Sequence, residues 1–134
     1  MKPVEVLLVE DNAADAFLVC QGLAASPIPV KLHIAQDGMQ ALLMLSSGAF
    51  QPDLVILDLN LPNVSGHDLV ELFDPKDVPV VVFSSSQDDD MKRSLALGAC
   101  DHVQKPTDIH AYSDAVCGIV EKWAVRRERH HTHH

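Results

Sequence analysis

The stretch DLVILDLNLP, residues 53–62, constrains the fold of this chain more than any other. Its centre, Leu54 to Leu57, is an unbroken and partly β-branched apolar run, which is typical of a strand buried on both faces of a sheet. The run ends at Asp58, and the turn-forming residues between Pro62 and Gly66 then favour a loop. Asp58 is therefore predicted at the carboxyl end of a central strand, where open parallel sheets bind their ligands. The alternative is that Asp58 only caps the following segment.

The rest of the chain alternates between strand and helix patterns. Further strands are predicted at residues 4–9, 30–35, 80–83 and 99–104. Helical spacing of apolar residues is found from Asn12 to before Pro27, from Asp37 to Gly48, from Gly66 to about Phe73, from the acids at 88–90 to Gly98, and from Ile109 to Trp123. Asn12 and Asp37 are predicted helix N-caps. Five strands alternating with five helices predict a three-layer α/β domain, in which helices cover both faces of a parallel sheet.

Composition indicates a single globular unit. The 134 residues are 47% hydrophobic, which is enough for one core, and we expect the domain to span residues 1–127. The His-rich ending, residues 128–134, resembles a purification tag and is left out of the fold. We see no signal peptide and no apolar run that approaches 18 residues, so neither export nor a membrane partner is expected.

Cysteine usage and charge narrow the function classes. Cys20, Cys100 and Cys117 are odd in number and widely spaced, which argues against a disulfide framework or a zinc site and favours a reduced cytoplasm. The net charge of -9 would repel nucleic-acid phosphates, so we expect no nucleic-acid partner. His33, His67 and His110 are scattered without ligand spacing and are predicted at the surface.

Chemically active side chains follow the predicted strands. They are Glu10 and Asp11 after the first strand, Asp58 after the third, Ser84 after the fourth and Lys105 after the fifth. In a sheet ordered 2-1-3-4-5, the first and third strands are neighbours, and three carboxylates would meet at one edge. Like charges about 4 Å apart repel by about 4 kcal/mol at an effective dielectric of 20, so the cluster needs raised pKa values or a cation. An all-oxygen site favours Mg²⁺ or Mn²⁺.

These motifs together resemble the receiver domain of bacterial two-component response regulators. The resemblance is carried by Glu10-Asp11, by Asp58, Pro62 and Gly66 in the spacing D-x-x-x-P-x-x-x-G, by the hydroxyl after VVVF, and by Lys105-Pro106, and it covers residues 4 to about 123. It implies a flavodoxin-like fold with the strand order given above. Because no output domain follows, the chain is most similar to stand-alone receivers of the chemotaxis kind. The opening VEDNAADAFLV is similar to the phytochrome-associated kind.

The resemblance implies a role for each site residue. Asp58 would take a phosphoryl group from a phosphohistidine of a sensor kinase or phosphotransfer protein, and the receiver would catalyse its own phosphorylation and dephosphorylation. Asp11 and Asp58 would ligate the metal, Glu10 would act partly through water, and Asn60 would contribute its carbonyl oxygen. Lys105 would pair with the phosphate, and a cis peptide bond would precede Pro106.

The resemblance also implies a switch. Ser84 would swing its hydroxyl toward the phosphorylated Asp58, and an aromatic residue on the fifth strand would turn inward. This chain has His102 at that place, which departs from the family pattern. The alternative for His102 is ordinary solvation on an edge strand. The output surface, residues 88–97, 100–104 and 109–120, would bind a downstream protein. A second copy of the chain is a further candidate partner. Asn60 and Ser86 would flank the path of the water that removes the phosphoryl group.

Three other functions fit parts of the pattern. An adaptor with the receiver fold would dock a partner without being phosphorylated, but Asp11, Asp58 and Lys105 argue against it. A carrier of flavin mononucleotide would need phosphate-binding amides where the loop from Glu10 is acidic. A metal-dependent phosphatase would need a general acid two residues beyond the nucleophile, where Asn60 stands.

Overall fold

The computed structural model describes residues 2–48, 51–62, 64–74, 76–85 and 88–132. The strands are β1 (Val4–Val9), β2 (Val30–Ala35), β3 (Leu54–Leu57), β4 (Val80–Ser84) and β5 (Asp101–Gln104). The helices are α1 (Ala13–Ala25), α2 (Gly38–Ser46), α3 (Gly66–Glu71), α4 (Asp88–Ala96) and α5 (Ile109–Thr132). The predicted alternation of five strands with five helices is therefore confirmed.

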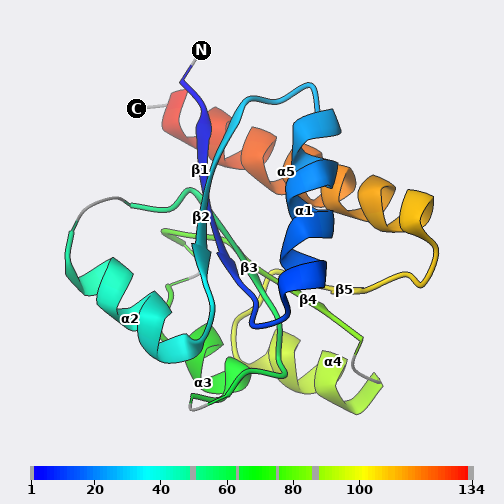
Figure 1. The fold of residues 1–134 in the computed structure, drawn as a ribbon. Helices are drawn as coiled ribbons and strands as arrows, with labels where there is room; N and C mark the ends of the chain where they lie inside the picture. The colour runs from blue at the N-terminus through cyan, green and yellow to red at the C-terminus, as the bar shows by residue number, and fades with distance from the viewer. Residues whose placement is uncertain (1, 49–50, 63, 75, 86–87, 133–134) are drawn as a thin grey trace.

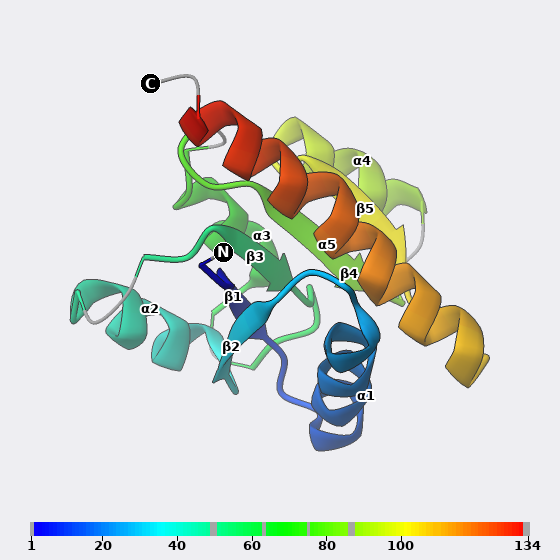
Figure 2. The same cartoon turned by 90° about the horizontal axis from the view of Figure 1, so that it is seen from above.

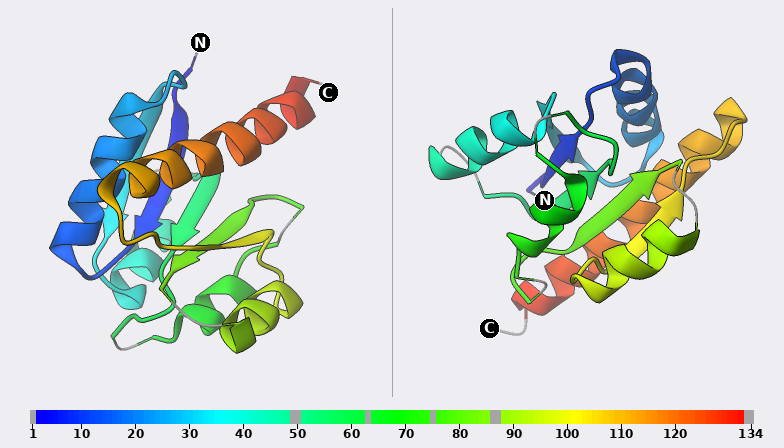
Figure 3. Two further views of the ribbon diagram at one scale, coloured as in Figure 1. Left: turned by 90° about the vertical axis from the view of Figure 1, so that its right-hand side faces the viewer. Right: turned by 90° about the horizontal axis from the view of Figure 1, so that it is seen from below.

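All strands pair in parallel, in the order β2-β1-β3-β4-β5, as predicted (Figure 1). The views from above and from the side show helices on both faces of the twisted sheet (Figures 2 and 3). The start of β1 and the last turns of α5 lie at the end of the molecule opposite the carboxyl ends of the strands. The carboxyl edge is thus left to the loops that follow each strand.

Alternation along the strands divides the core into two clusters. On β3, Leu54 and Ile56 face α1 and α5, whereas Val55 and Leu57 face the side covered by α2 and α3. All four residues of β3 are fully buried, which agrees with a central strand covered on both faces. This burial fixes the position of the strand whose end carries Asp58.

The helices α1 and α2 begin at the predicted caps. The side-chain oxygen of Asn12 accepts a hydrogen bond from the amide of Asp15 at 3.0 Å, and Asp37 accepts one from the amide of Gln40 at 2.7 Å. Gly98 ends the turn after α4 with a φ of +118°, a conformation that favours glycine.

Several element boundaries differ from the prediction. The strand β4 ends at Ser84 instead of residue 83. β5 begins at Asp101 instead of residue 99, and α3 ends at Glu71 instead of 73. The helix α5 continues to Thr132, so the backbone of residues 128–132 is helical. No glycine or proline follows Gly118 to stop the helix.

The helix α5 is fastened to the neighbouring strand near residue 123. The carboxylate of Asp101 on β5 accepts hydrogen bonds from the Lys122 ammonium and the Trp123 indole, both at 3.4 Å, and the Lys122 ammonium lies 5.1 Å from the centre of the Trp123 ring.

Among the described residues, no helix combines the length and the apolar character that crossing a bilayer requires.

Candidate functional site

The register of the central strands brings two acidic residues together. Val9 is paired with Leu57, so that Glu10 and Asp58 are the next residues on adjacent strands. Two backbone bonds continue the ladder past this point: the amide of Asp58 donates to the Val9 carbonyl at 3.1 Å, and that of Glu10 to the Ala35 carbonyl at 3.0 Å. Both side chains are buried, with 3% of Glu10 and 7% of Asp58 exposed.

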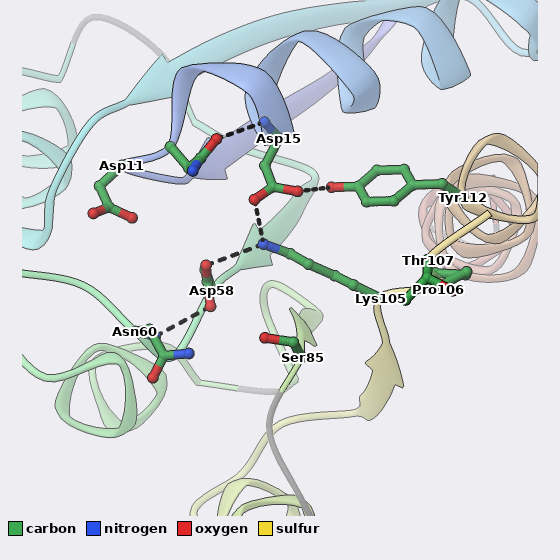
Figure 4. A pocket seen from close by; sticks show the side chains of 10 residues that line it. Asp11, Asp15, Asp58, Asn60, Ser85, Lys105, Pro106, Thr107 and Tyr112 are labelled. Carbon is green, nitrogen blue, oxygen red and sulfur yellow. Dashed lines mark hydrogen bonds and ion pairs between the residues drawn. The ribbon is translucent and has the colours of Figure 1, made fainter. Parts of the chain in front are cut away.

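The Lys105 side chain reaches across the end of the sheet to these acids. Its Nζ lies 2.6 Å from Glu10 Oε1 and 3.1 Å from Asp58 Oδ2. A third carboxylate, that of Asp15 on α1, lies 3.4 Å from the same nitrogen (Figure 4). The amide of Lys105 donates to the Ser84 carbonyl at 2.9 Å, so the end of β4 holds the backbone of Lys105 in place.

Three carboxylates form a cluster suited to a metal ion. Glu10, Asp11 and Asp58 each offer one oxygen, and these oxygens all lie within 4.8 Å of one another. The three residues follow β1 and β3, the neighbouring strands at which the sequence predicted such a cluster. A set of oxygen ligands of this kind fits a hard divalent cation such as Mg²⁺ or Mn²⁺.

The shared burial of these charges perturbs their pKa values. Burial, assisted by the negative charge of Asp58, raises the pKa of Glu10 to about 7. Burial alone would also raise the pKa of Asp58, but the Asn60 amide and the Lys105 ammonium outweigh it and hold that pKa below its usual value. For Lys105, the hydrogen bond to Glu10 and the charge of Asp58 overcome desolvation, so its pKa is raised and it stays protonated.

Gly66 sets the shape of the loop that follows Asp58. A Cβ atom at Gly66 would lie 2.6 Å from the Leu59 Cα and 2.9 Å from the Asp58 carbonyl oxygen, so only glycine allows these backbones to approach. Within the loop, the amide of Asn60 donates to Asp58 Oδ1 at 3.1 Å. The loop therefore orients the Asp58 carboxylate from the backbone.

An open pocket of about 560 Å³ lies above these residues (Figure 4). Its lining includes four residues that the sequence singled out for the site: Asp11, Asp58, Asn60 and Lys105. It also includes residues that the sequence did not place there: Asn12, Asp15, Ser85, Pro106, Thr107 and Tyr112. The Tyr112 hydroxyl donates to Asp15 Oδ1 at 2.9 Å. Glu10 is not part of the lining, because it is buried beneath Lys105.

The two residues predicted to form the switch lie outside the pocket lining. Ser84 is fully buried, and its neighbour Ser85 lines the pocket instead. Pairing of Val82 with His102 and of Ser84 with Gln104 places Ser84 and His102 on the same face of the sheet, the one that Val80 and Val82 share with α3. His102 is only 6% exposed, so the alternative interpretation, in which it is solvated on an edge strand, is wrong.

Other residues of the site prediction have mixed outcomes. The peptide bond between Lys105 and Pro106 is trans, so the expected cis bond is absent. His110 is exposed, but His33 is half-buried, with its Nε2 2.6 Å from Glu5 Oε2, and His67 is 8% exposed on the inner side of α3. The surface prediction was therefore wrong for His67. Ser86 lies outside the described residues.

The family model and the similar proteins found by sequence comparison belong to the same class of protein. A family model described as the response regulator receiver domain matches residues 6–116. The chain is 34% identical to the response regulator Rcp1 of Synechocystis over 131 residues, which cover 90% of this chain and 89% of that protein.

Solved structures give the same result. The crystal structure of the phosphorylated cyanobacterial phytochrome response regulator RcpA is similar with a TM-score of 0.84 and 34% identity, covering 92% of this chain and 95% of that one. The Mn²⁺-bound form of response regulator Rcp1 is similar with a TM-score of 0.82 and 33% identity, covering 90% and 94%.

Proposed function

Because this chain belongs to the response regulator receiver family, we propose that it is a signalling switch controlled by phosphorylation of Asp58. The phosphoryl donor would be a phosphohistidine on a sensor kinase or phosphotransfer protein. The observation that carries the proposal is the position of the Asp58 carboxylate: it lies at the end of β3, 3.1 Å from the Lys105 ammonium and beside Glu10 and Asp11.

Asp58 has the properties of a nucleophile. Its lowered pKa keeps the carboxylate ionised at neutral pH, and an ionised carboxylate can form a covalent intermediate. One carboxylate oxygen would attack the phosphorus atom while the bond from phosphorus to the donor imidazole nitrogen breaks. The imidazole takes the bonding electron pair, and the product is an aspartyl phosphate.

The residues around Asp58 fit a divalent metal ion. A cluster of three carboxylates lies beside one ammonium group, which leaves an excess of negative charge. Burial, with a smaller contribution from the charge of Asp58, raises the pKa of Glu10. Asp11 and Asp58 would hold Mg²⁺ or Mn²⁺ directly, Glu10 partly through water, and Asn60 through its carbonyl oxygen. When bound, the ion would neutralise charge on the transferring phosphoryl group.

Lys105 would supply the second positive charge. It is protonated and already within 3.1 Å of Asp58, so its ammonium needs little movement to contact a phosphoryl oxygen. A compact ammonium on a flexible stem suits such a point contact.

Ser84 and His102 would carry the response to the rest of the domain. Both are buried on the same face of the sheet, and the Ser84 carbonyl is bonded to the Lys105 amide. New acceptor oxygens on Asp58 would draw the Ser84 hydroxyl out of this buried position and move the segment after β4. The response would be read by a downstream protein at the surface of α4, β5 and α5.

The comparison with solved structures also indicates a class of sensor kinase as the partner. The solved structures that resemble this chain include a phytochrome response regulator, which is 34% identical and of which 95% is covered. We infer a partner kinase of the phytochrome type. Transfer of labelled phosphate from such a kinase to this protein, faster than from an unrelated histidine kinase, supports this inference; equal rates contradict it.

Mass spectrometry after incubation with acetyl phosphate and Mg²⁺ tests the main proposal. The protein should gain one phosphoryl mass, and the Asp58→Asn variant should gain none. Asp53→Asn is the matched control, because it removes the same charge at the other end of β3, and it should be modified like the wild type. If the wild type gains no phosphoryl mass, the proposal fails and the phosphorylation-independent adaptor is favoured. If Asp58→Asn is modified equally, Asp58 is not the phosphorylated residue and the proposal fails as well.

A further inference from the structure

The Lys105 ammonium has a third partner that the proposed phosphotransfer does not use. Asp15, on the first turn of α1, places Oδ2 3.4 Å from Lys105 Nζ. In Figure 4, the Lys105 side chain extends into the space between Asp15 and Asp58. The ammonium is thus held from two elements, α1 and the end of β3.

The orientation of Asp15 is fixed from two sides. Its other oxygen, Oδ1, accepts a hydrogen bond from the Tyr112 hydroxyl at 2.9 Å, and its amide donates to the Asn12 side chain at 3.0 Å. With Oδ1 engaged by Tyr112, Oδ2 is the oxygen that faces Lys105. The Asp15 carboxylate therefore bridges α5 and the charged site.

Tyr112 is well suited to hold Asp15. It belongs to the first turn of α5, is buried, and packs edge-on against Phe83 of β4 with ring centres 5.1 Å apart. Burial and the neighbouring Asp15 raise the pKa of Tyr112 above its usual range, so the hydroxyl remains a proton donor. A buried hydroxyl that donates to a carboxylate is a charge-assisted hydrogen bond, which is stronger than a neutral one.

Asp15 also differs from the other partners of Lys105. Glu10 and Asp58 belong to the group of three carboxylates suited to a divalent cation, and Asp15 lies outside that group. Asp15 can therefore hold Lys105 whether or not the oxygens of Glu10 and Asp58 are engaged elsewhere.

We propose that Asp15, held by the Tyr112 hydroxyl, is a positioning residue for Lys105, and that it thereby couples the charge at Asp58 to the first turn of α5. This inference rests on the proposed function for its role in signalling. When the charge on residue 58 changes, the balance of attraction on the ammonium changes, and Asp15 passes this change to Tyr112. The path consists of two contacts, one ion pair and one hydrogen bond.

The first test needs no phosphorylation. Tyr112 is the only tyrosine of the chain, so protein labelled with [ζ-¹³C]tyrosine gives one reporter resonance. The substitution Asp58→Asn should shift this resonance in the wild-type background, and the shift should be lost in an Asp15→Asn background. Asp114→Asn is the matched control, because it removes the same charge from an exposed position on α5 and should leave the shift intact. An equal shift without Asp15, or no shift in the wild type, overturns the proposal.

The second test measures phosphorylation rates over a range of acetyl phosphate concentrations. Asp15→Asn should lower the maximal rate about tenfold with an unchanged KM, because positioning acts on the transition state rather than on substrate binding. Tyr112→Phe keeps the ring contact with Phe83 and should lower the maximal rate to a smaller extent. In the double variant, Tyr112→Phe should add nothing to Asp15→Asn, because both substitutions break the same path.

The outcomes separate this inference from the proposed function. Additive effects of the two substitutions, or unchanged rates in both single variants, overturn the positioning role. If the wild-type protein itself is not phosphorylated, the proposed function fails, and the tyrosine resonance still decides whether Asp15 couples residue 58 to α5. Circular dichroism of each variant establishes that it is folded, and Tyr112→Phe provides the rate test if Asp15→Asn does not fold.

Discussion

Two neighbouring regions of the molecule are both buried but opposite in chemistry: the body of β3 and the residue that follows it. Leu54 to Leu57 are fully enclosed by apolar neighbours, while Asp58, one peptide bond later, is enclosed by Glu10 and Lys105. Burial of each large apolar side chain on β3 contributes roughly 1.5 to 3 kcal/mol. A buried ion pair contributes little net stability, because desolvation offsets the attraction between the charges.

The difference indicates that the two regions respond to different variables. Packing inside the sheet has no charge to titrate and no ligand to gain, so its contribution should be constant across pH and metal concentration. At the carboxyl edge, Lys105 Nζ contacts three carboxylates, and the stability there depends on the charge that surrounds Asp58. Under the proposed function, we expect ions and phosphoryl groups to change the carboxyl edge but not the body of β3.

The largest effect is expected from Lys105→Met. This substitution keeps most of the packing volume but leaves Glu10 and Asp58 without their shared counter-charge. Removing one partner of a buried ion pair typically costs about 3 to 5 kcal/mol. Urea unfolding in the presence of EDTA should show this loss, and added Mg²⁺ should restore part of it. A loss that Mg²⁺ leaves unchanged would contradict the distinction between the two regions.

Leu57→Ala should cost about 3 kcal/mol, because it opens a cavity in a closely packed strand. Leu57 is fully buried, and its side chain belongs to the cluster that packs under α2 and α3. In contrast to Lys105→Met, the loss measured by urea unfolding should be the same at pH 6 and pH 8 and with or without Mg²⁺. A pH-dependent or metal-dependent loss would show that the strand body and the edge are not independent.

Glu10→Gln should change how stability depends on pH. Burial raises the pKa of Glu10 to about 7 from 4.5, so the folded protein binds this proton more tightly than the unfolded chain does. The resulting stabilisation is complete below pH 4.5 and is lost as the pH rises through about 7. Between pH 5 and pH 8, the metal-free wild type should lose on the order of 2 kcal/mol relative to Glu10→Gln. Parallel stability curves for the two proteins would disprove the raised pKa.

Asn12→Ala should have the smallest effect, about 1 kcal/mol, the usual contribution of an N-cap. Asn12 accepts the Asp15 amide hydrogen at the start of α1, so it supports the edge without carrying a charge. The loss, measured by thermal unfolding, should not vary with pH. A loss that increases with pH would place Asn12 in the charged network instead.

The fold was predictable because local and long-range signals agree. The apolar runs of β1, β3 and β4 are too short for helices and too continuous for exposed strands, and Asn12 and Asp37 mark the starts of α1 and α2. The extent of α5 was not predicted, because the basic residues after Trp123 lack the apolar spacing that marks a packed helix. Nothing in them interrupts a helix either.

Only those residues of the candidate site that directly follow a strand were predictable from the sequence. Glu10, Asp58 and Lys105 each follow a strand, so topology alone brings them to one edge. Asp15 and Tyr112 lie on helices, and their meeting depends on how α1 and α5 pack, which periodicity does not determine. One signal was available: Asp15 stands three residues after the predicted N-cap Asn12, in the first turn of the helix that follows Glu10 and Asp11.

The hydrogen bonds between α5 and Asp101 limit how this helix can move. Trp123 and Lys122 are tied to β5 at one point, and Tyr112 is tied to α1 three turns earlier. A helix attached at two such points cannot slide along its axis without breaking both sets of hydrogen bonds. It can pivot about one attachment point when the hydrogen bonds at the other point break. Trp123 is the only tryptophan in the chain, so its fluorescence would report the pivot without any added label.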